Sequence, residues 1–449
     1  DITLGFWPMD LVLFVARLGA GKCVDADTAV TDPLTGIPRS IRQVVEGNQR
    51  LVHTWSPELG IHSVPITAKV DTGRKECLKV TFSSGRSVVV TPEHPFLSPE
   101  GWLRADKVEV GGTLALPARI PFPINPVSLP AEEVDLLALL LTEGSYTGHH
   151  VGFSTGDSVC LDIAKEAAAK IGTVVKHQKK YDYDFIPSTP VDKILNKHGI
   201  HKKKAIVKTI PDAVFQLPAE LLGRFLGMVW MCDGYVDNSG PGITLASRDM
   251  VYQLQSLLLR FGVQSRVAYK KATCSGKIFD AWRLTVYSHA WNAFFENIPL
   301  RAHKAAALDK LLARDRNPNV GFPRVSDNFR SRIKQIAVSK RGGLLEVGRD
   351  LGWGSYFMVK SLFGKRNSLL LSRFETFCKV FECREEFKCV LNKDIFWDVV
   401  ADIESVGERK IYDLTVSPTS CFVANDVIVH NTWTSVQLAL CAWQQKKRV

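Results

Sequence analysis

The sequence predicts a multidomain protein in which an all-β unit is split by an α+β unit with an internal repeat, and a basic helical segment is added. Three observations predict this. Short runs of β-type residues lie near both ends of the chain, at residues 78–82, 87–91, 410–416 and 422–424. A 90-residue offset relates two similar segments in the middle. Residues 311–381 contain 14 basic and 5 acidic side chains, most of the net charge of +11.

Composition excludes several classes of protein. With 449 residues, 45% hydrophobic and 23% charged, the chain is ordinary globular material of about three domains. No apolar run approaches the ~18–20 residues of a membrane span, so we expect no membrane partner. The ten cysteines form no CxxC pair, which disfavours zinc, and reduced thiols without a secretory leader indicate a cytoplasmic protein. The start at Asp1 rather than Met suggests a fragment.

The two ends of the chain look like halves of one motif. A strand-type run, residues 10–15, leads into Gly19, Gly21 and Lys22, as in a loop whose backbone N–H groups cradle phosphates. Such a loop needs Ser or Thr after the lysine, but Cys23 follows here. The missing Thr432 opens a helix-type segment near the other end. Unless this is coincidence, residues 23–431 are an insert in a phosphate-binding loop.

The residues at both junctions carry complementary chemistry. The Cys23 thiol can attack the carbonyl of Lys22 and convert an amide into a thioester. The Thr432 hydroxyl can then take over the acyl group. Asn431 can cyclise through its side-chain amide and cut its own C-terminal peptide bond. Residues 23–431 therefore resemble an intein, a self-splicing protein element.

This resemblance implies an all-β, horseshoe-like Hint fold in two segments, residues 23–125 and 391–431, that needs no cofactor. The remaining site residues follow from motifs that match the family. In the TxxH motif, His94 would protonate or polarise the first scissile amide, and Thr91 would hold it. Asp413 would coordinate the first two steps. His430 would assist the cyclisation of Asn431. Many inteins carry a further His where this chain has Ser420, so assistance from His430 and water alone is expected.

The central repeat consists of two apolar segments, each ending in an acid and a glycine. They lie at residues 134–144 and 222–234, and helix-type segments follow each at 161–171 and 250–261. A sustained offset indicates a duplicated structural unit. We expect the first two segments to pack as helices through Ala138, Gly223 and Gly227, which would place the terminal acids side by side.

Residues 126–310 resemble the LAGLIDADG homing endonucleases, with repeats at about 126–215 and 216–310. The resemblance implies cleavage of double-stranded DNA at a homing site in the uninterrupted host gene. Glu143 and Asp233 would hold Mg²⁺, since paired carboxylates repel unless a cation lies between them, and Lys208 would be an active-site lysine. The second half has Glu296 near the equivalent position, so one lysine is expected to be missing. A weakened nuclease, or a DNA-binding relic, remains an alternative.

The basic segment, residues 311–390, has two open interpretations. Residues 344–352 and 355–363 look helical and are followed by Lys365 and Arg366, which fits a DNA-binding helix-turn-helix. A solvated basic helical insert is equally compatible.

The flanks, residues 1–22 and 432–449, resemble the ATPase core of DnaB-type replicative helicases and related RecA-like proteins. This implies that the spliced host binds ATP and Mg²⁺ through Gly19, Gly21, Lys22 and Thr432, and works as a hexameric helicase on DNA. A nucleotide-binding ATPase with a large insertion and no self-processing is the competing hypothesis.

Overall fold

The structure is a computed structural model, and it describes residues 22–146, 150–200, 205–274, 276–313, 321–322, 327–341, 344–352 and 369–431. Gly19, Gly21 and Thr432 lie outside the described residues, so the predicted phosphate-binding loop is described only at Lys22. Within the described ranges, no helix combines the length and the apolar character needed to cross a membrane.

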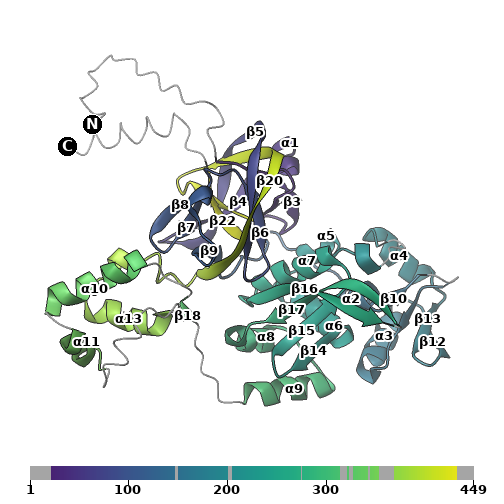
Figure 1. The fold of residues 1–449 in the computed structure, drawn as a ribbon. Coiled ribbons are helices and arrows are strands. Elements are labelled where there is room, and N and C mark those ends of the chain that lie inside the picture. The colour runs from purple at the N-terminus through teal and green to yellow at the C-terminus, as the bar shows by residue number, and fades with distance from the viewer. Residues whose placement is uncertain are drawn as a thin grey trace.

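Two long strands organise the β unit, and they come from opposite ends of the chain (Figure 1). Strand β5 (Gly60–Phe82) pairs antiparallel with β20 (Ile395–Val416), from Phe82 opposite Val400 to Ile66 opposite Val416. They belong to a six-stranded sheet of order β4-β5-β6-β1-β20-β9, and a four-stranded sheet has the order β21-β22-β7-β8. The other strands of these sheets are β1 (Val24–Asp25), β4 (Leu51–Ser56), β6 (Ser87–Val90), β7 (Pro95–Ser98), β8 (Gly101–Arg104), β9 (Thr113–Pro117), β21 (Cys421–Ala424) and β22 (Val427–His430).

The predicted all-β unit in two segments is therefore present, but its long strands extend far beyond the predicted runs. Residues 78–82 and 410–416 are only the ends of β5 and β20. The middle of β5 is mostly half-buried or exposed, although the facing residues 411–416 of β20 are buried. Hydrophobic alternation, the signal used to predict strands, is weak along this part of β5 because few of its own side chains are buried.

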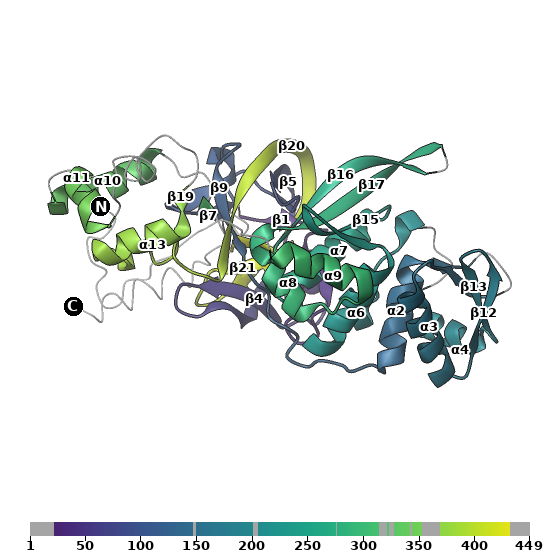
Figure 2. The same ribbon diagram turned by 90° about the horizontal axis from the view of Figure 1, so that it is seen from below.

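The α+β unit is built twice on the same plan (Figure 2). Helices α2 (Ala131–Thr142) and α6 (Ala219–Cys232) pack together, and each is followed by a four-stranded antiparallel sheet. The sheet orders, β10-β11-β13-β12 and β14-β15-β17-β16, are identical in plan. The first half contains β10 (Gly144–Ser145), β11 (Gly152–Ser154), α3 (Ser158–Lys170), β12 (Val174–Lys179), β13 (Asp182–Ile186) and α4 (Thr189–Lys197). The second contains β14 (Gly234–Asp237), β15 (Gly240–Leu245), α7 (Arg248–Leu259), β16 (Ser265–Cys274), β17 (Lys277–Val286) and α8 (Trp291–Asn297), and α9 (Ala302–Leu312) follows.

The repeat register matches the predicted offset, since α3 and α7 begin 90 residues apart. Both helices start two or three residues before the predicted segments because each has a side-chain cap. The Asp157 carboxylate accepts from the backbone N–H of Val159 (2.8 Å), and the Ser247 hydroxyl accepts from that of Met250 (3.2 Å).

The predicted role of the glycines in α6 is wrong. A Cβ on Gly223 would lie 2.4 Å from the carbonyl oxygen of Asn297, and one on Gly227 would lie 2.5 Å from that of Pro299. These glycines therefore allow close approach of the end of α8 and the residues after it, not of helix α2. Residues four apart share one helix face, but sequence alone does not say which neighbour meets that face.

The two units are joined by direct contacts. The turn between β5 and β6 lies on the α+β unit, where the Ser84 carbonyl accepts from the Val267 N–H (2.9 Å) and the Gln255 amide (3.0 Å). The Tyr252 hydroxyl donates to the Gly85 carbonyl (2.9 Å). These bonds satisfy backbone groups of one unit with donors of the other, so the units form a shared interface.

The basic segment forms α10 (Asp327–Arg341), α11 (Leu344–Asp350) and α13 (Leu371–Val380), with strands β18 (Gly321–Phe322) and β19 (Leu369–Leu370). Phe329, Phe374 and Phe377 form a core that continues onto Trp55 and Ile428 of the β unit. The helix predicted at 344–352 is α11, whereas the one predicted at 355–363 lies outside the described residues. A packed helical module, not a purely solvated insert, is present.

Candidate splicing and nuclease sites

The backbone around Cys23 is tied to the TxxH motif. The Cys23 N–H, which belongs to the peptide bond after Lys22, donates to the Thr91 hydroxyl at 3.2 Å. The Thr91 N–H in turn donates to the Cys23 carbonyl at 3.1 Å. Strand β1 also pairs with β6 and β20, which fixes this junction between two neighbours. Thr91 thus holds the nitrogen of the predicted scissile amide directly.

The Cys23 thiol is buried, and its pKa is raised to about 12. Burial is the main cause, and the negative charge of Asp413 adds to it. The thiolate is the nucleophilic form of cysteine, so this side chain is held in its unreactive form near neutral pH.

This pKa predicts a steep pH dependence of thioester formation. Because neutral pH lies far below a thiol pKa of about 12, the thiolate fraction rises about tenfold for each pH unit. We expect thiol-induced release of residues 1–22 from an Asn431→Ala chain to accelerate about tenfold from pH 7 to pH 8. A rate constant that is flat over this range would contradict thiolate attack as the limiting step.

His94 is fully buried and lies beside both junctions. Its pKa is lowered to about 3, first by burial and then by the charges of His430 and Lys22, although backbone groups of Cys23 and Lys22 act in the opposite direction. Neither ring nitrogen makes a hydrogen bond of ordinary geometry within the described part of the chain. The imidazole is therefore neutral at physiological pH, which suits polarisation of an amide through an N–H better than donation from an imidazolium.

Asp413 is buried on β20, one strand from Cys23. Residue 412 pairs with Val24 of β1, and Asp413 itself lies opposite Val70 of β5. Its charge raises the pKa of Cys23 and opposes the lowering of the Lys22 pKa by burial. Asp413 is thus electrostatically coupled to both residues of the first junction.

The second junction is equally enclosed. The Asn431 side chain is fully buried, and its Nδ2 donates to the Val416 carbonyl at 3.0 Å. His430 Nδ1 lies at the carbonyl oxygen of Asn431, and because a carbonyl only accepts, Nδ1 carries the proton. The indole of Trp102 packs edge-on against the His430 ring, with centroids 4.6 Å apart. The imidazole is therefore aimed at the carbonyl of the bond that Asn431 would break.

Ser420 stands at the position for which the resemblance to inteins predicted a histidine in many members. Its main chain contacts the second junction. The Ser420 carbonyl accepts from the Asn431 N–H at 2.9 Å, and the residue has a positive φ of 57°. The imidazoles coupled to this junction within the described ranges are those of His430 and His94.

The α+β unit brings Glu143 and Asp233 together at the C-terminal ends of α2 and α6, as the sequence predicted. Burial raises the pKa of both carboxyls, that of Glu143 to about 7, and the charge of Asp233 contributes to the shift of Glu143. Two desolvated acids that repel each other form a site that a cation would relieve.

Lys208 lies over the end of α2, where its Nζ donates to the carbonyl of Leu141 at 2.9 Å. Lys304 occupies the matching place at the end of α6, where its Nζ donates to the carbonyls of Trp230 (2.9 Å) and Met231 (2.6 Å). Both lysines favour ionisation of Asp233 and of Glu143.

The prediction that the second half lacks a lysine, with Glu296 near the equivalent position, is wrong, because Lys304 lies at this place. The second half reaches the site from α9, beyond the Asn297–Pro299 segment, so a constant offset from Lys208 does not find it. The signal for it in the sequence is a lysine in the short segment after Pro299.

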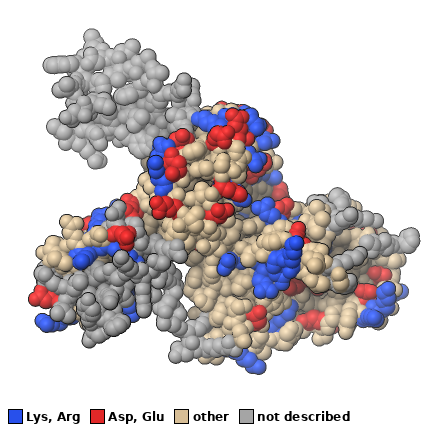
Figure 3. Space-filling model, viewed as in Figure 1, with Lys and Arg blue, Asp and Glu red and all other residues tan. Residues whose placement is uncertain are grey.

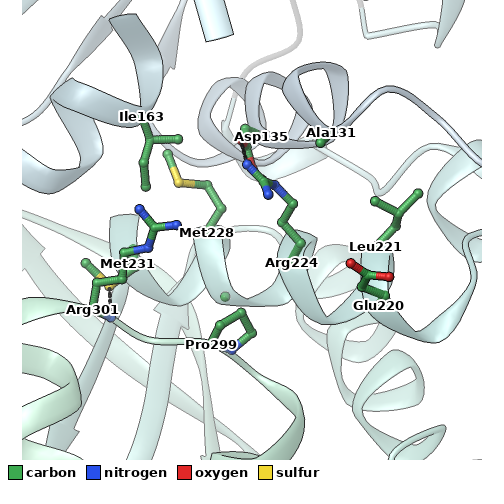
Figure 4. A pocket seen from close by; sticks show the side chains of 11 residues that line it. Ala131, Asp135, Ile163, Glu220, Leu221, Arg224, Met228, Met231, Pro299 and Arg301 are labelled. Carbon is green, nitrogen blue, oxygen red and sulfur yellow. Dashed lines mark hydrogen bonds and ion pairs between the residues drawn. The ribbon is translucent and has the colours of Figure 1, made fainter. Parts of the chain in front are cut away.

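A pocket of about 300 Å³ also lies between α2 and α6, and its lining runs along α6 from Glu220 to Met231 (Figure 4). Its charged pair is already satisfied, since the Arg224 guanidinium donates to both oxygens of Asp135 at 2.7 Å. The pocket is otherwise lined largely by apolar side chains such as Met228 and Pro299. It therefore offers no reactive group comparable to the acidic pair.

The β unit brings together the Cys23 thiol, the Asn431 side chain and the imidazoles of His94 and His430. This set of groups defines a self-processing protein. A family model described as "Intein splicing domain" matches residues 35–431. The chain belongs to the intein splicing domain family.

Relatives include the replicative DNA helicase DnaB of Rhodothermus marinus, 27% identical over 93% of this chain and 46% of that protein. Protein RecA of Mycobacterium tuberculosis is 24% identical over 91% of this chain and 56% of its own length. The chain thus spans about half of the relatives it matches.

Two solved structures are also similar. One is a Ssp DnaB mini-intein variant, M86, with 10% identity, 93% of this chain and 99% of that chain covered, and a TM-score of 0.31. The other comes from mesophilic variants of the homing endonuclease I-DmoI. It is 12% identical, the match covers 40% of this chain and 97% of that chain, and the TM-score is 0.28.

Proposed function

We propose that this chain excises residues 23–431 from itself and joins Lys22 to Thr432. The observation that carries the proposal is the position of His94, which is coupled electrostatically to Lys22 on one side and to His430 on the other. One buried imidazole at both junctions fits a reaction that must cut two peptide bonds in one place.

In the first step, the Cys23 thiol attacks the Lys22 carbonyl and displaces the Cys23 nitrogen, which gives a thioester. Thr91 holds that nitrogen through the 3.2 Å hydrogen bond, which orients the scissile amide toward the thiol. A neutral His94 would donate an N–H to the scissile amide as charge develops. The Thr432 hydroxyl then attacks the thioester, and the N-terminal flank moves to Thr432 as an ester.

In the next step, Asn431 Nδ2 attacks its own main-chain carbonyl and breaks the bond to Thr432. The hydrogen bond that Nδ2 donates to the Val416 carbonyl increases the electron density on the nitrogen, and His430 Nδ1 donates to the oxygen that becomes negative. The proton that Nδ2 loses ends on the released amino group of Thr432. The ester then rearranges to a peptide bond between Lys22 and Thr432. All of this uses groups of the chain, without a cofactor.

We propose that ligation restores a phosphate-binding loop from Gly19, Gly21, Lys22 and Thr432, which would take ATP and Mg²⁺. The named relatives, a replicative helicase and RecA, support a host of this type. A hexameric helicase on DNA in the cytoplasm is the corresponding proposal for the host.

Expression of the full chain followed by intact mass measurement tests the splicing proposal. We expect two products, the excised residues 23–431 and a peptide in which residue 22 is joined to residue 432. A chain that stays at 49.9 kDa under reducing conditions at neutral pH would instead favour an ATPase with an inert insertion.

We also propose that residues 126–310 cleave double-stranded DNA at the uninterrupted host gene, near the codons of Lys22 and Thr432. The observation that carries this second function is the acidic pair with one lysine from each half. A pseudo-twofold pair of half-sites suits a substrate with two strands.

Glu143 and Asp233 fit a magnesium ion, because hard carboxylate oxygens are its preferred ligands and both are destabilised without a cation. When bound, Mg²⁺ would activate water toward a phosphodiester. Among the described residues, no cluster of three or more potential ligands forms, which leaves coordination positions for water and phosphate. Lys208 and Lys304 would each offer an ammonium to the phosphate of one strand.

The sheets supply a basic face for the proposed DNA contact. On β16, Arg266 and Lys270 alternate with the buried Val267, and Arg283 of β17 lies on their side, opposite Ala268. Lys and Arg side chains gather over this part of the surface (Figure 3). Phosphate contacts from such side chains would position the duplex without reading its sequence. We propose that the module of residues 311–390 adds to this contact.

A further inference from the structure

Strand β5 contains an irregularity beside the first junction. Ile411 lies opposite Gly73 and Tyr412 lies opposite Asp71, so the intervening Thr72 is an extra residue on β5. This is a β-bulge, a feature that bends a strand and re-aims a side chain. Gly73 has a φ of +87°, and no atom would lie within 4 Å of a Cβ there. Backbone conformation, not space, is the reason for glycine at this position.

The bulge is held by a local network. The Asp71 carboxylate accepts from the Gly73 N–H at 3.0 Å and from the ammonium of Lys410 on the facing strand. The lysine lowers the pKa of Asp71, so the acceptor is ionised at neutral pH. Hydrogen bonds from β5 and from β20 therefore both stabilise the bulge.

The re-aimed side chain meets the nucleophile. The Cys23 thiol donates to the Thr72 hydroxyl oxygen, with Sγ and Oγ1 3.3 Å apart. Cys77 and Ile411 are buried with the sulfur in the same cluster, and the negative charge of Asp413 also acts on it. Such surroundings oppose formation of a thiolate, and a hydroxyl at the sulfur acts in the opposite direction.

We propose that Thr72 is a further catalytic residue of the first step. Its hydroxyl oxygen first accepts a hydrogen bond from the Cys23 thiol and so orients it, and its O–H then donates a hydrogen bond to the thiolate. This inference rests on the proposed splicing function. A hydroxyl suits both states, because it can rotate from accepting to donating without moving its oxygen. A methyl group in its place could do neither.

The step balances without a further reactant. The S–H bond of Cys23 and the bond between the Lys22 carbonyl carbon and the Cys23 nitrogen break. A bond between Sγ and the Lys22 carbonyl carbon forms, and the thiol proton ends on the released amino group of Cys23. Thr72 keeps its own proton throughout, and no electron transfer occurs.

The test uses the full chain with Asn431→Ala, which blocks the second junction, and measures thiol-induced release of residues 1–22. Adding Thr72→Val, which keeps the shape and removes the hydroxyl, should slow release about 10- to 100-fold, the effect of losing one hydrogen bond to a charged group. Thr72→Ser should stay within about 3-fold, since it keeps the hydroxyl. Gly73→Ala, which strains the bulge and leaves Thr72 present, should slow release as well.

A matched measurement separates catalysis from folding. In a Cys23→Ala chain, where only Asn431 cyclisation operates, Thr72→Val should leave cleavage before Thr432 unchanged within about 2-fold. Equal slowing at both junctions, or a wild-type release rate for Thr72→Val, would overturn the role of Thr72. Thiol-induced release that persists in the Cys23→Ala chain would overturn the splicing proposal itself, which is a distinguishable result.

Discussion

Replacing Cys23 by alanine in the full chain should abolish the joined product of residues 1–22 and 432–449. The Cys23 sulfur is the atom that becomes part of the proposed thioester, and removing a covalent nucleophile costs on the order of 10³-fold or more in rate. Cleavage before Thr432 should continue, because Asn431 is enclosed by its own partners at Val416 and Ser420. Mass spectrometry would detect a chain of residues 1–431 and a released C-terminal flank.

The complementary variant is Asn431→Ala, which should stop cleavage before Thr432 and leave the first junction reactive. Added thiol should then release residues 1–22. Cys77→Ala is the matched control, because Cys77 is a second buried thiol in the cluster around Cys23 and has no place in the proposed reaction. Joined product from the Cys23→Ala chain, or its loss in the Cys77→Ala chain, would contradict the assignment.

Glu143→Gln and Asp233→Asn should each reduce DNA cleavage by on the order of 10²-fold or more, while duplex binding persists. Each change keeps the shape of the side chain and removes a charge that a cation needs. Loss of a negative charge near phosphates does not weaken binding. Cleavage and gel-shift measurements on the uninterrupted host sequence, with and without Mg²⁺, would separate the two effects.

The pKa of Glu143 adds a pH dependence to this result. Because that pKa is raised to about 7, the carboxyl is largely protonated below neutral pH and ionised above it. Cleavage by the unmodified chain should therefore rise between pH 6 and pH 8, since only the ionised form can hold a cation.

Glu220→Gln is the control, because Glu220 is exposed in the first turn of α6, far along the helix from Asp233. Cleavage that survives both Glu143→Gln and Asp233→Asn would refute the proposed site. Comparable losses for Lys208→Met and Lys304→Met would support one lysine from each half of the repeat.

Several features could be predicted because their partners are adjacent in the chain or share a period. The reactive groups Cys23 and Asn431 border the flanks directly, so bond chemistry alone relates them to Lys22 and Thr432. The 90-residue offset depends only on repeated spacing, and the structure places α3 and α7 in that register. The acids that end α2 and α6 follow from the same symmetry.

Other features depend on which residues meet across a strand or helix face. Lys304 enters its site from α9, a helix outside the repeated spacing. The glycines of α6 face the end of α8 and the residues after it, not α2. Neither relation is visible in local sequence, because a helix face can be covered by any neighbour of suitable shape.

The sequence by itself determined which atoms can react, and in which order along the chain they stand. Only the tertiary structure decided how those atoms are held, as the bulge at Thr72 illustrates. A shift of one residue in strand pairing turns a side chain to the opposite face, so the contact between Thr72 and Cys23 exists only in the register that β5 and β20 adopt. That register is set by long-range pairing of two strands more than 300 residues apart, which no local pattern encodes.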